Sequence, residues 1–159
     1  MNIEPYYYLA SLSLEPGSII RPGNWGRIIE RYETPSAVRQ TFGNLNTVAR
    51  ELLFEMVRLE TFPDRPSRLR AAFCCPALAD MQFYRAKIDP HGFQIIYEVE
   101  LLEPDQPTHI APLAMVDFAE GSLFLSETSA RAQRYWTGHP DGPQEIVTLS
   151  PLKIRSVMP

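Results

Sequence analysis

A segment rich in glycine and proline carries the first residues whose types suit ligand chemistry. Residues 21–27, Arg-Pro-Gly-Asn-Trp-Gly-Arg, hold two arginines and one of the two tryptophans of the chain. A guanidinium presents N–H donors in a fixed fork, and an indole ring offers a flat apolar surface. Such residues on a loop often bind ligands. The alternative is that Trp25 packs on the core while Arg21 and Arg27 are solvated.

Two further groups of charged residues could do chemistry. Arg65, Arg68 and Arg70 form a basic cluster just before an apolar stretch. This cluster either faces a ligand or is solvated on an exposed loop. Glu98 and Glu100 alternate along one expected strand, so they share a face and could pair as acid and base.

The motifs of common metal and catalytic sites are absent from the sequence. His91, His109 and His139 lie far apart, and there is no CxxC or HExxH pattern, so we expect no zinc site. The sequence also lacks a P-loop, a GxGxxG and a GxSxG motif. Cys74 and Cys75 are adjacent and cannot join distant segments. With no base beside them in the sequence, we expect both to be buried structural thiols.

Composition favours one globular domain over residues 1–159. The chain is 45% hydrophobic and 21% charged, which is enough apolar material for a single core. Fifteen prolines disfavour an all-helical fold, and a net charge of −4 argues against a sequence-independent nucleic-acid binder. No apolar run could cross a bilayer, and residues 1–17 lack the positive start of a signal peptide. We therefore expect no membrane partner and a cytoplasmic location, or that of an effector delivered without a cleavable signal.

The hydropathy pattern predicts strands and helices in a mixed order. The expected strands lie at 6–10, 18–20, 69–75, 92–102, 144–149 and 152–157, with a short one near 109–113 inside a loop over 103–120. The expected helices lie at 46–60, from 76 to about 84, and at 126–136. Because this order lacks a regular βαβ rhythm, it favours an α+β fold with split or mainly antiparallel sheets and flanking helices.

The helix expected over residues 46–60 has two chemically different faces. Glu51, Glu55 and Arg58 predict a solvated side, on which Glu55 and Arg58 can pair. Asn46 is the expected cap, and Ser126 or Thr128 is the expected cap of the helix over 126–136. The residues that recur at helical spacing and predict the core side are Val48, Ala49, Leu52, Leu53, Met56 and Val57.

Four segments, taken in order, form a recognisable pattern. They are Tyr7-Tyr8-Leu9 with Leu14-Glu15-Pro16-Gly17; Ala72-Phe73-Cys74 with the helix around Met81–Tyr84; Ile96-Tyr97-Glu98-Val99-Glu100 with Pro104; and Gln144-Glu145-Ile146-Val147 with Ser150-Pro151-Leu152-Lys153-Ile154. Across about residues 6–157, this pattern resembles the ADP-ribosyltransferase fold. Within that fold it is most similar to the small rifamycin-modifying transferases and to related bacterial domains of unknown function.

The resemblance implies a split-sheet fold and NAD as the substrate. Nicotinamide would leave the ribose of NAD through an oxocarbenium-like state, and ADP-ribose would pass to an acceptor or to water. The implied catalytic residues are Glu145, which faces the positive charge, and Tyr8, which stands where the family has a histidine and can donate one hydrogen bond to the ribose. The acceptor could be a protein, a small molecule or a nucleic-acid end. The residues expected to bind the nucleotide beside them are Tyr7, Arg21, Trp25, Arg27, Arg68 and Phe73, of which Arg21 and Arg27 could bind the pyrophosphate as forked donors.

The same comparison leaves a second function open. Ala72 occupies the position of the family's nicotinamide-stacking tyrosine, and strand alternation turns its neighbour Phe73 to the opposite face. Trp25 could supply the stacking surface instead. The alternative is a degenerate domain that binds a nucleotide or a protein partner without turnover, with Glu145 an exposed acid at a strand edge. The nucleotide hypothesis requires Tyr8 and Glu145 to share one pocket wall. We expect their strands to run side by side, and strands on opposite sides of the molecule would reject the hypothesis.

Overall fold

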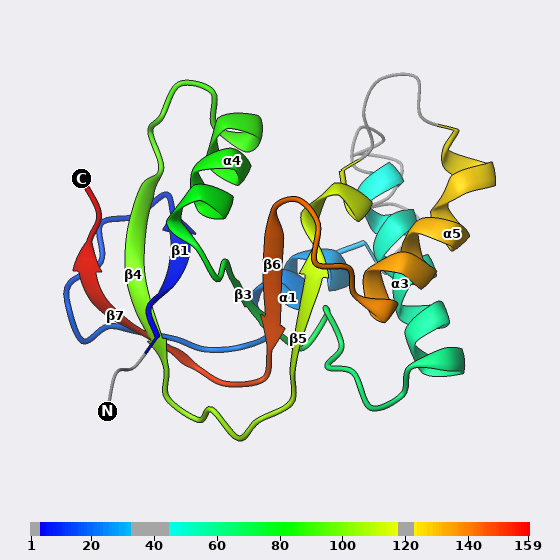
Figure 1. Ribbon diagram of the computed structural model, residues 1–159, viewed down its shortest axis with the longest axis horizontal. Helices are drawn as coiled ribbons and strands as arrows, with labels where there is room; N and C mark the ends of the chain where they lie inside the picture. Colours follow the sequence, from blue (N-terminus) through cyan, green and yellow to red (C-terminus); the bar gives the residue numbers. More distant parts are fainter. Residues whose placement is uncertain (1–3, 33–44, 118–122) are drawn as a thin grey trace.

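Two antiparallel sheets with flanking helices form the molecule, as Figure 1 shows for the computed structural model, which describes residues 4–32, 45–117 and 123–159. The α+β class with antiparallel sheets is therefore confirmed. The four-stranded sheet has the order β1 (Tyr6–Ala10), β4 (Ile95–Leu101), β7 (Leu152–Val157) and β2 (Ile19–Ile20). The three-stranded sheet has the order β3 (Ala72–Cys74), β6 (Gln144–Thr148) and β5 (Thr108–Pro112).

The helices lie on either side of the smaller sheet. In Figure 1, α3 (Leu45–Thr61) and α5 (Phe124–Thr137) lie at one end of the molecule, with the four-stranded sheet at the other. The helix α4 (Leu78–Ile88) packs on β1, and α5 packs on β5 and on the short 3-10 helix η2 (Leu113–Met115). Residues 118–120 of the expected loop lie outside the described residues.

Two buried clusters hold these layers together. Tyr97, Leu152 and Ile154 fill the inner face of the four-stranded sheet. Phe54 of α3 and Trp136 of α5 pack with the smaller sheet, and the Trp136 indole N–H donates to the Phe54 carbonyl at 2.8 Å. Tyr135 and Trp136 both belong to the core, because neither side chain is exposed.

The two sheets meet at their edge strands β1 and β3. Tyr7 and Cys75 form an isolated antiparallel bridge, with N–H to carbonyl distances of 2.9 and 2.8 Å. The strand β3 then pairs with β6. The strand of Tyr8 therefore does not run beside the strand of Glu145, and that prediction is wrong: β3 lies between them. The strands β1 and β6 therefore belong to different sheets, on opposite sides of this junction, with only β3 between them.

The segment predicted as a loop over residues 21–27 forms a helix in its second half. The helix α1 (Asn24–Glu30) begins directly after Gly23, whose φ of 92° is the left-handed conformation that glycine adopts without strain. The Gly23 N–H donates to the Ala71 carbonyl at 2.9 Å. Gly26 brings the helix so close to the next loop that an added Cβ would lie 1.8 Å from the Leu69 carbonyl oxygen. The glycines therefore dock a helix here and do not mark an open loop.

The faces of α3 differ from the prediction. Leu52 and Met56 are 52% and 63% exposed, whereas Glu51 is 1% and Arg58 is 8% exposed. The helix buries the stripe that contains Glu51, Phe54 and Arg58. The two charged side chains, Glu51 and Arg58, are buried because they bind partners on the loop over 62–70. The expected pairing of Glu55 with Arg58 is confirmed at 2.7 Å.

The observed bounds of the strands lie closer to the predicted bounds than the observed helix starts lie to the predicted caps. The strands β1, β6 and β7 start where alternation predicted, and β4 has Val99 buried with Glu98 and Glu100 on its opposite face, each paired with a cation. The strand β3 is shorter than predicted because a turn from Ser67 to Arg70 precedes it. Helices α3 and α5 begin at Leu45 and Phe124, before the expected caps.

Candidate functional site

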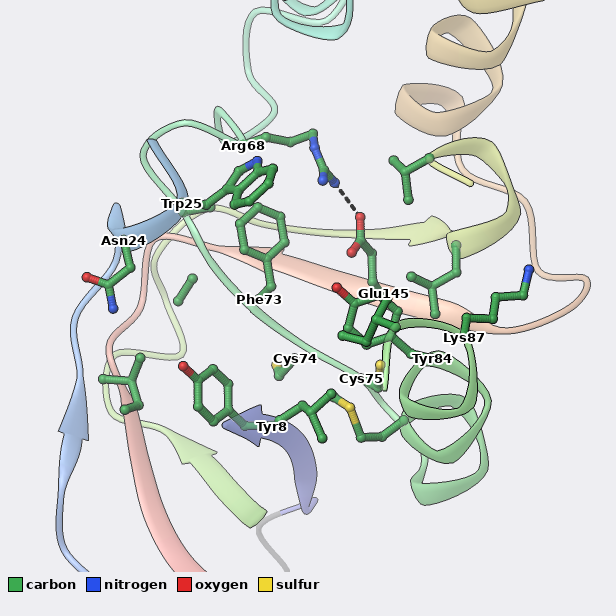
Figure 2. A pocket seen from close by; sticks show the side chains of 18 of the residues that line it. Tyr8, Asn24, Trp25, Arg68, Phe73, Cys74, Cys75, Tyr84, Lys87 and Glu145 are labelled. Carbon is green, nitrogen blue, oxygen red and sulfur yellow. Dashed lines mark hydrogen bonds and ion pairs between the residues drawn. The ribbon is translucent and has the colours of Figure 1, made fainter. Parts of the chain in front are cut away.

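A cavity of about 450 Å³ opens where the two sheets meet. Its wall draws on β1, the end of β2, α1, the loop before β3, β3 itself, α4 and β6, and Figure 2 shows these side chains converging on one space. Sites for small molecules commonly have this size and a largely apolar lining with a few polar groups. Here the apolar lining includes Leu9, Ile20, Met81, Leu113 and Val116.

The polar centre of the wall is an ion pair between Arg68 and Glu145. The Arg68 Nη1 group donates to Oε1 of Glu145 (Figure 2), and both side chains are almost fully buried. The hydroxyl of Tyr135 donates to the same oxygen and accepts a hydrogen bond from Arg68 Nη1. Among the described residues, no donor lies on the second oxygen, Oε2, and Glu145 lines the cavity. One oxygen is thus held by the protein, and the other remains for a ligand.

Glu51 of α3 holds the other side of the Arg68 guanidinium. Its Oε2 accepts from Arg68 Nε at 2.9 Å and its Oε1 from Nη2 at 3.2 Å, a bidentate fork. Arg50 donates to Oε1 of Glu51 at 2.8 Å and to the Val116 carbonyl at 2.8 Å. Charges therefore alternate from Arg50 through Glu51 and Arg68 to Glu145. Arg50, Arg68 and Glu145 line the cavity, and Glu51 does not.

The loop over residues 62–70 places Arg68 because α3 ties it down. Arg58 donates to the carbonyls of Pro63 and Arg65, at 3.2 and 3.0 Å. Glu55 accepts from Arg58 and from the Ser67 hydroxyl at 3.0 Å. These contacts satisfy backbone groups that a loop packed on a helix would otherwise leave unpaired. The polar stripe of α3 is therefore buried against this loop, which carries Arg68 to the cavity.

Aromatic rings border the guanidinium. Its central carbon lies 4.8 Å from the centre of the Phe73 ring and 5.0 Å from that of Tyr135. Phe73 pairs with Val147 across the two strands, so it shares a face of the sheet with Val147 and with Glu145, two residues away. Phe73 points to the face of the sheet opposite that of Ala72, as strand alternation predicts. Glu145 lies on the same face as Phe73.

Tyr8 and Trp25 add two more aromatic side chains to the cavity wall. Figure 2 shows the Tyr8 ring rising from β1 and the Trp25 ring lying beside Phe73. Within the described residues, the Trp25 indole N–H is buried without a hydrogen-bond partner. Burial raises the pKa of Tyr8, so its phenol stays protonated and remains a donor near neutral pH.

Electrostatics keep Glu51 and Arg68 ionised. Burial pushes the pKa of Glu51 up, but the positive charges and hydrogen bonds of Arg68 and Arg50 outweigh it, and the net shift is downward. For Arg68, burial lowers the pKa, yet Glu145 and Glu51 raise it well above its ordinary value. Burial, together with the charge and hydrogen bond of Glu145, raises the pKa of Tyr135 despite the opposing charge of Arg68. Tyr135 is therefore a neutral donor.

Most of the predicted site residues line this cavity, and two do not. Tyr8, Arg21, Trp25, Arg68, Phe73 and Glu145 are in the wall. Tyr7 packs instead in a cluster with Cys75 and Met81, because neighbouring residues of a strand face opposite ways. Arg27 is exposed, bonds to the Asn24 side chain and lies outside the wall.

The structure also corrects two sequence-based alternatives and adds residues that were missed. Glu145 is not an exposed acid at a sheet edge, since β6 is the middle strand of its sheet and the residue is 7% exposed. Arg68 is not solvated, whereas Arg65 and Arg70 of the same cluster are exposed. Sequence reasoning missed Glu51 and the hydroxyl of Tyr135. A signal for Glu51 was its place on one helical stripe with Phe54.

Both cysteines lie in the interior of the protein. Cys74 and Cys75 are free and buried, as expected, and burial raises the pKa of both thiols. Within residues 4–32, 45–117 and 123–159, no group of three His, Cys, Asp or Glu side chains comes together as a metal site would need. In the same part of the chain, no helix is both long enough and apolar enough to span a membrane.

These observations define an α+β domain with a cavity at its sheet junction and a buried row of charges in the cavity wall. The chain belongs to the family described as "protein of unknown function (DUF2441)", whose profile matches residues 26–157. That match includes Arg68 and Glu145, and it begins within α1, after Tyr8, Arg21 and Trp25. The search of curated proteins gives no match.

Proposed function

We propose that the cavity binds NAD and that the protein transfers its ADP-ribose to an acceptor or to water. The observation that carries this proposal is the meeting of Tyr8, Arg21 and Glu145 in one cavity wall. These residues come from three separate parts of the chain. The sequence resemblance to ADP-ribosyltransferases implies Tyr8 and Glu145 for one nucleotide site, and the forked donors of Arg21 suit its pyrophosphate.

The proposed transfer of ADP-ribose uses side chains of the cavity wall. The bond between the ribose carbon and the nicotinamide nitrogen breaks, and nicotinamide leaves with the electron pair. The sugar then carries positive charge, which the fixed carboxylate of Glu145 stabilises. An acceptor oxygen or water forms the new bond to that carbon and loses its proton. Tyr8 donates a hydrogen bond to the ribose, and Arg21 faces the pyrophosphate as a forked donor.

The arrangement of the two sheets supports the proposed ADP-ribosyltransferase-like fold. The cavity lies at the junction of a four-stranded and a three-stranded antiparallel sheet. We propose that this arrangement is an ADP-ribosyltransferase-like split. Trp25 and Phe73 take the place of the stacking tyrosine, for which the chain has Ala72.

A second candidate function is binding of a nucleotide without turnover. The specific observation in its favour is that Arg68 and Tyr135 both bind Oε1 of Glu145, so a neighbouring cation offsets part of the negative charge that catalysis needs. In this case the cavity takes the same ligand, but the ligand is left intact.

Calorimetric titration with NAD, followed by measurement of nicotinamide release, separates the two functions. We expect binding at or below about 1 mM NAD and slow release of nicotinamide. Glu145→Gln keeps the shape of the side chain and should lower release by about 100-fold with binding retained. Glu100→Gln is the matched control, since Glu100 also pairs with cations but lies outside the cavity wall.

Each outcome assigns one function or rejects both. Binding with intact NAD after long incubation selects the non-catalytic candidate. Absence of binding at about 1 mM NAD would reject both. Equal release by the wild type and Glu145→Gln would remove the glutamate from the proposed reaction.

A further inference from the structure

The row of charges behind the cavity is costly for a structure that needs only stability. Arg50, Glu51, Arg68 and Glu145 form three successive ion pairs, and three of these four side chains are buried. Moving charges out of water costs several kcal/mol per ion, and apolar residues of similar volume often stabilise a core as well or better. The row therefore calls for an explanation beyond stability, and the place of Arg50, Arg68 and Glu145 in the cavity wall supplies one.

Glu51 fixes the plane of the Arg68 guanidinium. The fork from Nε and Nη2 to the two oxygens of Glu51 leaves the guanidinium little rotational freedom. The rings of Phe73 and Tyr135 lie near the same group, at 4.8 and 5.0 Å. As a result, the N–H groups of Nη1 have fixed directions, and Glu145 and the Tyr135 hydroxyl accept from Nη1.

Two donors then converge on a single oxygen of Glu145. Both Arg68 Nη1 and the Tyr135 hydroxyl bind Oε1, while no described residue donates to Oε2. A carboxylate held by two donors on one oxygen is fixed in rotation about its last side-chain bond. Its other oxygen keeps a constant position in the cavity wall.

The geometry points to Arg68 as the positioning residue of Glu145, with Glu51 and Tyr135 as the groups that hold it. Arg68 acts through Glu145: it binds Oε1 and leaves Oε2 in a fixed place for the ligand. Its effect on turnover rests on the proposed function. Misplacing a catalytic group by about 1 Å can cost about 100-fold in rate.

Two pairs of conservative variants test this assignment. Arg68→Lys keeps the charge but cannot form the fork. Its control is Arg155→Lys, because Arg155 also lies between two glutamates, Glu98 and Glu100, but outside the cavity wall. Tyr135→Phe removes one donor to Oε1, and it keeps the proposal testable if Arg68→Lys fails to fold.

The control for Tyr135→Phe is Tyr97→Phe. Tyr97 is equally buried, and its hydroxyl accepts from the Leu14 N–H at 2.9 Å and donates to the Leu12 carbonyl at 3.2 Å. It lies outside the cavity wall. Loss of a buried hydroxyl is therefore common to both variants, and only Tyr135→Phe changes the contacts of Glu145.

Steady-state nicotinamide release gives the first readout. We expect Arg68→Lys to lower kcat by about 100-fold and Tyr135→Phe by about tenfold, with KM changed less than about threefold, and both controls to keep wild-type kcat. A merely structural role would lower thermal stability without this split between kcat and KM. Folded Arg68→Lys and Tyr135→Phe proteins with kcat within about twofold of wild type overturn the assignment.

A second measurement does not depend on NAD consumption. If the wild type does not consume NAD, the proposed reaction is rejected, but the positioning of Glu145 by Arg68 is still tested. Protein labelled with ¹³C at the glutamate carboxyl carbons shows a Glu145 resonance that Glu145→Gln removes. We expect this resonance to be narrow in the wild type and to shift and broaden in Arg68→Lys or Tyr135→Phe, but not in Arg155→Lys or Tyr97→Phe. An unchanged Glu145 resonance in the first two variants overturns the assignment.

Discussion

Arg68 and Glu145 are 77 residues apart in the chain, and they meet in a buried ion pair in the cavity wall (Figure 2). The pair joins the loop that follows α3 to the middle strand of the smaller sheet. Because Glu51 is fully buried on the other side of Arg68, the arginine is the one described cation shared by two buried carboxylates. Stability and site geometry therefore depend on the same side chain.

We expect Arg68→Met to destabilise the fold by about 3–5 kcal/mol, the typical cost of removing one partner of a buried ion pair. The loss leaves Glu145 with Tyr135 alone and Glu51 with Arg50 alone. Urea unfolding measures the change. Arg155→Met, which breaks a partly exposed pair, should cost no more than about 1 kcal/mol.

The double variant Glu51→Leu/Arg68→Met refines this prediction. Removing both partners leaves fewer uncompensated buried charges, so its cost should be well below the sum of the two single costs. Costs that simply add, or an Arg68→Met cost as small as that of Arg155→Met, would contradict a coupled buried network.

The contrast between β1 and α3 shows how much of the fold was predictable. The strand Tyr6–Ala10 was predicted with its observed bounds, because local alternation and aromatic side chains suffice to mark a strand. The core side of α3 was predicted correctly at Val48 and Val57, but hydropathy wrongly assigns two buried side chains, Glu51 and Arg58, to water. Their partners lie on a loop whose position depends on tertiary packing, and no local pattern shows that packing.

The same distinction holds for the site. Glu145 and Tyr8 were predicted from a sequence resemblance and Arg21 from its guanidinium on a glycine-rich segment, and all three line one cavity. The row of charges behind Glu145 could not be predicted, because Glu51 and Arg68 are brought together by the turn of the chain after α3. The α1 helix was missed for a related reason: Gly23 and Gly26 usually mark a loop, and only the approach to Leu69 shows why glycine is needed within a helix.

Gly26→Ala tests the docking of α1 against the loop that carries Arg68. A Cβ at this position would lie 1.8 Å from the Leu69 carbonyl oxygen, so backbone must move. We expect a loss of about 1–3 kcal/mol or more in urea unfolding, as for other overpacked sites. A second consequence is weaker ligand binding, because Trp25 on α1 and Arg68 beyond Leu69 both line the cavity.

The matched control is Gly142→Ala. Gly142 has a φ of 76° and open space around it, so alanine there meets only the backbone penalty of about 1–2 kcal/mol and leaves the cavity intact. Wild-type ligand binding by Gly26→Ala would show that α1 does not need this close contact to shape the cavity.

His109 should make the fold sensitive to mild acid. Burial lowers the pKa of this imidazole below its ordinary value of 6.5, although the hydrogen bond to the Tyr135 carbonyl and the charge of Glu145 oppose the shift. The unfolded chain therefore takes up the proton at higher pH than the native state does. The stability from neutral His109 is complete above pH 6.5 and declines as the pH falls below it.

Urea unfolding at about pH 7.5 and about pH 5.5 measures this effect. We expect His109→Gln to lose stability less steeply than the wild type over that interval. His139→Gln, a change at an exposed imidazole, should keep the wild-type slope. Equal slopes in all three proteins would remove His109 as the source of the acid sensitivity.

Arg21 and Arg27 belong to one short segment, and the structure separates them: Arg21 lines the cavity and Arg27 does not. If the cavity holds a ligand with a pyrophosphate, Arg21→Gln removes a charge-assisted hydrogen bond worth about 1.5 kcal/mol, which weakens binding roughly tenfold. Arg27→Gln removes the same charge from the same segment and should leave the dissociation constant within about twofold of wild type. Calorimetric titration with NAD compares the dissociation constants of the two variants directly. The net charge of the protein changes equally in both variants, so a long-range charge effect would weaken NAD binding by the same factor in each. Equal weakening, or a larger effect for Arg27→Gln, would place the phosphate-binding surface outside the cavity.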